Sequence, residues 1–339
     1  MKTDPLDALT RSLAGSFAFC GVGVAQGGAR HLSLATAPGI NADEDTMFRV
    51  ASISKLVVGQ AVAARVNAGD VSWDSDISEI LGWPLRHPDA PDVPVTLGMV
   101  ASHASGLSDD AGYVLPPDLT LQDWFASKPV FAAKPGSRFD YANLNYVVLA
   151  TALEALTGQA FPDAFGAYLP QPGGFNWCNV PDAAATNRLP TFRSDEGEFL
   201  PQIDFEIPRI RLARNVGVFS PQGGLRISLN GMLYLAESLR AADATPLWDA
   251  AMGETHDPDG VFEAYGPGLQ IFDHPRFYPR PLVGHFGNAY GFRGGVWYDQ
   301  ARDLSFAYAL NGFPMGDESD AFATEELQIF EAVSDLQVP

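Results

Sequence analysis

Hydrophobic and polar positions alternate in several segments near the two ends of the chain. Residues 16–26 are rich in small, aromatic and β-branched side chains, and residues 31–36 alternate apolar with polar or small ones. Because the Gly27-Gly28 pair between them is typical of a turn, this region predicts a hairpin of two strands. Strand-like runs near the other end, the last two joined by a turn over residues 299–303, occur at residues 269–272, 292–298 and 304–310.

Other segments have the periodicity of helices. Residues 52–66 are apolar on most sides, and Gly69 just beyond them is a typical stop signal, so a buried helix is expected here. Further helical patterns occur at residues 145–156, 229–239 and 320–336. Between about residues 71 and 208, short helical stretches alternate with loops rich in Pro and Gly, and strand alternation is scarce.

The two ends of the chain therefore supply strands with flanking helices, whereas the middle supplies helices. This order predicts an α/β (α+β) fold in which distant parts of the chain share one sheet. We expect residues 1–70 and 209–339 to form one α/β lobe and residues 71–208 to form an inserted, mainly helical lobe.

Composition narrows the function classes. The 21 Lys and Arg against 41 Asp and Glu give a net charge of −20, which disfavours nucleic acid and anionic membrane surfaces as partners. There is no run of about 20 apolar residues and no basic-then-apolar start, so neither a membrane span nor a signal peptide is expected, and a cytoplasmic location fits best. Cys20 and Cys178 are far apart and are expected to be buried free thiols.

One lysine lies in a segment where a charged side chain is unusual. The chain has only four lysines, and Lys55 lies inside the apolar helix predicted over residues 52–66. A dry environment would depress its pKa, as a proton acceptor near neutral pH requires. Ser52 lies one helical turn earlier, so the hydroxyl and the amine can touch. Ser-x-x-Lys alone is a weak motif, because a serine at a helix start and a snorkelling lysine would also produce it.

Residues 48–55, Phe-Arg-Val-Ala-Ser-Ile-Ser-Lys, closely resemble the first motif of serine β-lactamases and of related DD-peptidases and esterases. Residues 135–146, with Tyr141 and Asn143, resemble the Tyr-x-Asn element of the class C-like branch. Gly284-His285-Phe286-Gly287 resembles the third element, Lys-Thr-Gly or His-x-Gly on an edge strand. Further landmarks match at residues 102–107 and 220–225. The resemblance implies a β-lactamase/transpeptidase-like fold, an antiparallel sheet flanked by helices.

The resemblance also implies roles for three central residues. Ser52 would attack a carbonyl and form an acyl-enzyme. Lys55 and Tyr141 would share the tasks of taking the serine proton and delivering one to the leaving group, in an order that the sequence leaves open. The simpler interpretation of Tyr141 is a core aromatic residue with a satisfied hydroxyl.

The resemblance also places four further residues in the substrate-binding and oxyanion part of the site, namely Asn143, His285, Gly287 and Asn288. Asn143 would hydrogen-bond Lys55 and the substrate's acyl-side amide, and His285 would orient the proton network or supply positive charge when protonated. Asn288, the residue after Gly287, would form the oxyanion hole together with Ser52, each through its backbone N–H. The alternatives are a helix cap for Asn143 and an ordinary strand histidine for His285.

Two other conspicuous polar residues, His103 and Asn145, are assigned to structure. The remaining histidines lack metal-ligand spacing, so neither a metal nor another cofactor is expected.

The third motif departs from the β-lactamase pattern. His285 and Phe286 stand where lysine and threonine would help to hold a substrate carboxylate, so hydrolysis of small esters or amides is favoured over β-lactam hydrolysis. A true β-lactamase or D-alanyl-D-alanine peptidase is the alternative enzyme, and a non-catalytic or singly acylated sensor is the alternative outside enzymes. The pocket walls are expected from loops at residues 109–117 and 193–214, with residues 201–214 as a rim.

Overall fold

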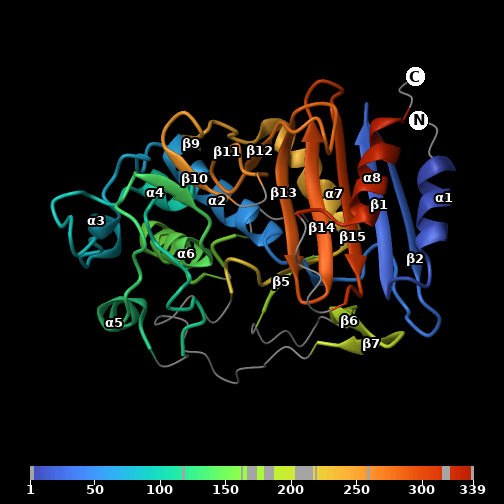
Figure 1. Cartoon of the computed structure of the whole chain (residues 1–339), viewed down its shortest axis with the longest axis horizontal. Coiled ribbons are helices and arrows are strands. Elements are labelled where there is room, and N and C mark those ends of the chain that lie inside the picture. The colour runs from blue at the N-terminus through green and yellow to red at the C-terminus, as the bar shows by residue number, and fades with distance from the viewer. Residues whose placement is uncertain are drawn as a thin grey trace.

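The computed structural model describes residues 4–116, 119–161, 163–165, 174–178, 187–202, 217, 220–257, 260–314 and 321–336. Figure 1 shows a large sheet on one side of the molecule and the helices of the middle of the chain, α3 to α6, on the other. The helices are α1 Asp4–Leu13, α2 Ile53–Asn67, α3 Ile77–Leu81, α4 Leu97–Ala101, α5 Leu121–Ser127, α6 Asn143–Thr157, α7 Leu229–Ser238 and α8 Thr324–Ser334.

The main sheet has eight strands in the order β2-β1-β15-β14-β13-β12-β11-β9, and all neighbours are antiparallel. Its strands come from both ends of the chain. They are β1 Phe19–Gln26, β2 Ala29–Thr36, β9 Trp248–Asp249, β11 Ala264–Tyr265, β12 Gln270–Phe272, β13 Leu282–Ala289, β14 Phe292–Asp299 and β15 Leu304–Asn311.

Smaller sheets support the rest of the described chain. A three-stranded sheet joins the segment before α2 to the segment before α7, and two further pairs are a parallel pair, β4 with β10, and a hairpin, β6 with β7. These strands are β3 Phe48–Arg49, β4 Arg138–Asp140, β5 Asn176–Trp177, β6 Phe192–Asp195, β7 Glu198–Pro201, β8 Leu225–Ile227 and β10 Glu254–His256.

Alternation along β15 determines which helices cover which face of the main sheet. Phe306 and Tyr308 belong to the apolar cluster that includes residues of α1 and α8, whereas Ala307 and Ala309 belong to the cluster that includes α7. Successive side chains of a strand point to opposite faces, so bulky residues meet one pair of helices and small residues admit α7 close to the sheet. Gly21 of β1 serves the same purpose, because a Cβ there would lie 2.6 Å from Leu229 Cδ2.

The predicted fold class is confirmed, and most elements lie where the pattern placed them. The first hairpin and the last are present as β1–β2 and β14–β15, and the predicted helices correspond to α2, α6, α7 and α8. Helix α1 was not predicted. The division into an α/β lobe and an inserted lobe stays a prediction, and residues 203–214 of the proposed rim lie outside the described residues.

Candidate active site

Ser52 stands at the start of α2, on a backbone turn that is held from several sides. Ala51, the preceding residue, has φ of 48°, a left-handed conformation that is rare for a residue other than glycine. The turn is fixed because Val50 N donates to Leu225 O of β8 at 3.0 Å. The Ser54 hydroxyl donates to Ala51 O at 2.6 Å and accepts from Leu225 N at 3.0 Å. Strain of this kind costs about 1–3 kcal/mol and is typical of functional sites.

Lys55 is fully buried, and its amine is held in one place by three partners. Lys55 Nζ lies 2.9 Å from Ser52 Oγ, 2.8 Å from Asn143 Oδ1 and 2.9 Å from the backbone oxygen of Gln222. The Tyr141 ring centroid is 4.8 Å from the same nitrogen. The expected contact between the hydroxyl of Ser52 and the amine of Lys55 is therefore present, on one face of α2.

Burial changes the acid–base behaviour of Lys55. Loss of hydration disfavours the charged amine and lowers the Lys55 pKa from 10.5 to about 7, while the negative charge of Asp109 acts in the opposite direction. An amine with this pKa is partly neutral at physiological pH. It can therefore accept a proton from a hydroxyl group that it touches.

Tyr141 precedes α6, and its hydroxyl forms a hydrogen bond with Ser52. Burial raises the Tyr141 pKa well above its usual value, and the hydrogen bond to Ser52 only partly opposes this rise. Tyr141 therefore stays a neutral phenol around neutral pH. The structure brings Ser52, Lys55 and Tyr141 together, so the partner that satisfies the Tyr141 hydroxyl is the serine of the first motif.

Asn143, the first residue of α6, connects Lys55 to Asp109. Its side-chain oxygen accepts from Lys55, and its side-chain nitrogen donates to Asp109 Oδ2 at 2.9 Å. Asp109 also accepts from the backbone N–H groups of Asn143 at 2.8 Å and Leu144 at 2.9 Å. The helix cap is therefore Asp109 rather than Asn143.

His103 and Asn145 are buried in the packing behind Tyr141. His103 Nδ1 accepts from Ala142 N at 3.2 Å, and its ring stacks on the Tyr141 ring with centroids 4.3 Å apart. Asn145 Oδ1 accepts from Ser105 Oγ at 2.5 Å. Both side chains hold the segment that carries Tyr141, in agreement with a structural role.

His285 lies on β13, and its ring is held as a neutral group. Its Nδ1 lies 2.5 Å from Phe286 O and therefore carries the proton, which leaves Nε2 to accept from the Tyr265 hydroxyl at 2.8 Å. Burial and the charge of Lys55 lower the His285 pKa to about 3. Of the two roles expected for His285, orientation of the network fits this environment, and the supply of positive charge does not.

Gly287 allows β13 to lie against the turn before Ser52. A Cβ at this position would lie 2.5 Å from Val50 O and 3.3 Å from Ala51 Cβ. The resemblance places the third motif on an edge strand, but β13 is not the outermost strand, because β12 follows it in the sheet. However, β12 pairs only with residues up to Gly284, so within the described chain the later part of β13 has a strand neighbour on one side only.

The hairpin geometry shows where the Asn288 backbone points. Tyr290 and Gly291 both have positive φ, 63° and 80°, which is typical of a two-residue type I′ turn closed by Ala289 and Phe292. Hydrogen-bonded and non-hydrogen-bonded pairs alternate along an antiparallel ladder, so Asn288, opposite Arg293, directs its N–H away from β14. The Asn288 N–H therefore faces the open side of β13.

We expect Gly287→Ala to lower kcat about 10- to 100-fold, because the added methyl group would push β13 away from the turn that precedes Ser52. The same clash should reduce the free energy of unfolding by about 1–3 kcal/mol. Gly223→Ala is the matched control, since its Cβ would meet nothing nearer than Ala51 C at 3.8 Å. Ester hydrolysis and urea unfolding of both variants measure the two effects, and equal rates in both would contradict this role of Gly287.

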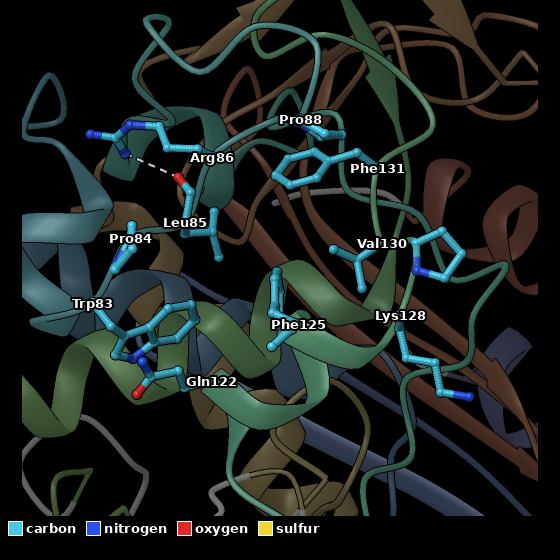
Figure 2. A pocket seen from close by; sticks show the side chains of 12 residues that line it. Trp83, Pro84, Leu85, Arg86, Pro88, Gln122, Phe125, Lys128, Val130 and Phe131 are labelled. Carbon is cyan, nitrogen blue, oxygen red and sulfur yellow. Dashed lines mark hydrogen bonds between the residues drawn. The ribbon is translucent and has the colours of Figure 1, made fainter.

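A separate hollow of about 400 Å³ lies between α5 and the segment after α3. Figure 2 shows the apolar side chains of Leu85, Phe125, Val130 and Phe131 around it. Its lining contains no serine, threonine, cysteine, histidine or carboxylate, so it offers no group suited to acyl transfer. Across the described ranges, no cluster of three or more metal-ligating side chains occurs, and no helix is long and apolar enough to cross a bilayer.

Three residues of the site were missed in the sequence. Asp109 was included only as part of a wall loop, although it follows the landmark at residues 102–107. Gln222 contributes a backbone oxygen, for which residue type gives no signal. Tyr265 is a lone aromatic residue far from any motif, and only the pairing of β11 with β12 brings it to His285.

The fold and this arrangement of serine, lysine and tyrosine define a serine hydrolase. The family model described as beta-lactamase matches residues 9–328, and the chain belongs to the β-lactamase family. Esterase EstB from Burkholderia gladioli is 28% identical over 310 residues, covering 79% of this chain and 78% of EstB. D-aminopeptidase from Brucella anthropi is 28% identical over 193 residues, which are 56% of this chain and 34% of that enzyme.

Solved structures agree on the fold. The β-lactamase/D-alanine carboxypeptidase from Yersinia pestis has a TM-score of 0.75 at 15% sequence identity, over 98% of this chain and 99% of that chain. At this identity the likeness concerns the fold alone.

Proposed function

We propose that this serine hydrolase cleaves small esters or amides through an acyl-enzyme on Ser52. The observation that carries the proposal is the 2.9 Å contact between Ser52 Oγ and the buried Lys55 Nζ, in a chain whose environment lowers the Lys55 pKa to about 7. A hydroxyl group becomes a useful nucleophile when a nearby base takes its proton during attack. Lys55 is held where it can do so.

In the acylation step, Ser52 Oγ attacks the substrate carbonyl carbon as its proton passes to the neutral Lys55 amine. The backbone N–H groups of Ser52 and Asn288 stabilise the oxyanion of the tetrahedral intermediate. When the intermediate collapses, the bond to the leaving alkoxide or amine breaks, and the leaving group receives a proton from the Tyr141 hydroxyl. The Lys55 ammonium then gives its proton to the Tyr141 phenolate, so that both groups return to their neutral forms.

In deacylation, water replaces the leaving group and attacks the acyl carbonyl. Lys55 accepts the proton of the attacking water, the bond between the acyl carbon and Ser52 Oγ breaks, Ser52 Oγ takes a proton back from Lys55, and the carboxylic acid departs. We assign the acceptor role in acylation to Lys55, because burial depresses its pKa whereas burial of Tyr141 raises the phenol pKa. The neutral phenol is then the better proton donor.

The surroundings of the third motif favour uncharged ester or amide substrates. His285 is neutral, and the Phe286 ring packs on Phe262, 5.8 Å between centroids, where the β-lactamase pattern would place a hydroxyl. Phe262 in turn stacks on Tyr141 at 5.0 Å, so aromatic surface adjoins the reacting groups. EstB, similar over most of its length, is named an esterase. The names of the peptidase relatives support D-amino-acid amides as the second class to test.

We expect the wild-type protein to hydrolyse a short-chain nitrophenyl ester at least about tenfold faster, in kcat/KM, than a chromogenic cephalosporin or a D-alanyl-D-alanine peptide. Rapid quenching and intact-mass spectrometry should show one acyl group, which peptide mapping places on Ser52. Faster cephalosporin turnover would make the protein a β-lactamase. A stable adduct with no turnover would favour the sensor function, and an adduct on any other residue would overturn the proposal.

A further inference from the structure

Asp109 contacts the site from the loop that precedes α5. Its two carboxylate oxygens accept three hydrogen bonds of 2.8–2.9 Å, from the backbone N–H groups of Asn143 and Leu144 and from Asn143 Nδ2. The same oxygen, Oδ2, holds both the backbone and the side chain of Asn143. This double contact is more than a helix cap requires, because a cap needs only the backbone donors.

We propose that Asp109 is a positioning residue for Lys55, acting through the side chain of Asn143 and through its own negative charge. This inference rests on the proposed function of Lys55 as the proton acceptor. Asp109 touches neither Ser52 nor the reacting atoms, so it is not a catalytic residue.

The first part of the effect is the orientation of the Asn143 carboxamide. A carboxylate only accepts hydrogen bonds, so the NH₂ group of Asn143 turns to Asp109 and the oxygen turns to Lys55. The reverse orientation would place two NH donors against the Lys55 amine. Asp109 therefore fixes an acceptor 2.8 Å from Lys55 Nζ and keeps that amine within reach of the Ser52 hydroxyl.

The second part is electrostatic. Desolvation lowers the Lys55 pKa and the charge of Asp109 raises it, which leaves a base that titrates near neutral pH. His103 and His285 are neutral at that pH, because burial lowers both of their pKa values. The groups of the described chain that face Lys55 are Ser52 on its own helix, Tyr141, Asn143 and Tyr146 on or next to α6, the carbonyl of Gln222, His103, His285 on β13, and Asp109.

Asp109→Asn tests this inference with little risk to the fold, because asparagine also caps helices well. We expect kcat/KM for the nitrophenyl ester to fall about 10- to 100-fold. We also expect the acidic limb of the pH profile to move down by about one pH unit, since loss of the carboxylate makes Lys55 easier to deprotonate. Asp110→Asn is the control, because the Asp110 side chain is exposed and, among the described residues, Asp110 bonds through its backbone N–H to Ser108 Oγ and not through its carboxylate.

A measurement that needs no turnover separates this inference from the proposed function. The chain has four lysines, so a spectrum of protein labelled with ¹³C at the lysine ε-carbon contains few signals, and Lys55→Met assigns the one of interest. A lower Lys55 pKa in Asp109→Asn than in the wild type supports the inference even if no ester is hydrolysed. An unchanged Lys55 pKa together with an unshifted pH limb would overturn it, whatever happens to stability.

Discussion

Ser52→Ala is expected to reduce kcat/KM for a short-chain nitrophenyl ester by about 10⁴- to 10⁶-fold, because the substitution removes the oxygen to which the acyl group is transferred. The fold should be unaffected. Ser52 makes no side-chain cap for α2 and is a half-buried residue, so its truncation should leave no sizeable cavity. Steady-state kinetics and urea unfolding of the same preparation measure both expectations.

Ser54→Ala is the matched control, because the two serines lie in the same turn and only one faces Lys55. The Ser54 hydroxyl accepts from Leu225 N, so its removal leaves a buried N–H unsatisfied and should cost about 1–3 kcal/mol of unfolding free energy. Its kcat/KM should stay within about tenfold of the wild type, since Ser54 contacts no reacting group. Equal losses in the two variants would show that the hydroxyl of Ser52 is not the nucleophile.

The local part of the site could be predicted from the sequence. Ser52 and Lys55 lie one helical turn apart, so their contact follows from helix geometry once the segment is helical. Tyr141 and Asn143 sit beside the start of α6, and the motif fixes their spacing. Gly287 was included through the third motif, and the structure supplies the reason for a glycine there, since the close approach of β13 to Val50 admits no side chain.

The remaining contacts depend on pairings between distant segments. Lys55 and the Gln222 oxygen are 167 positions apart, and the partner is a backbone atom that every residue type possesses. Tyr265 reaches His285 across three neighbouring strands, β11 to β13, in a register that no short motif encodes. Asp109 is one of 41 acidic residues in a strongly acidic chain, so its charge alone does not distinguish it.

The state of His285 illustrates the same limit. The residue type predicts a group that titrates near neutral pH, which left both an orienting and a charged role open. The structure surrounds the ring with Tyr265, Phe286 and the charge of Lys55, and this environment lowers the His285 pKa to about 3. Burial, which is a property of the folded chain, therefore favours the orienting role over the charged one, and residue type alone could not make that distinction.

Lys55→Met is expected to lower kcat/KM about 10³- to 10⁴-fold and to change the pH dependence of stability in a direction fixed by the Lys55 pKa. In the folded wild type the pKa is about 7, against 10.5 for an unperturbed lysine. Between these values the unfolded chain binds a proton at Lys55 that the folded chain does not. Raising the pH removes that proton from the unfolded state alone, so this residue makes the folded state relatively more stable as the pH rises.

The slope of unfolding free energy against pH should therefore be more positive in the wild type than in Lys55→Met. The difference approaches about 1.4 kcal/mol per pH unit between roughly pH 8 and 9.5 and vanishes below about pH 6. Cys20, whose pKa burial raises to about 11, contributes a slope of opposite sign, but it is present in both proteins and cancels in the comparison. Urea unfolding at several pH values gives the two slopes.

Lys128→Met is the control for this experiment, because Lys128 is exposed beside the Trp124 ring and has no buried charge to lose. Its slope should match that of the wild type. A parallel slope in Lys55→Met would mean that Lys55 keeps an ordinary pKa and is protonated during attack, and the acceptor role would then pass to Tyr141. A steeper wild-type slope ties stability and catalysis to one feature, since the desolvation that makes a charged Lys55 unfavourable in the folded protein is also what makes it a base near neutral pH.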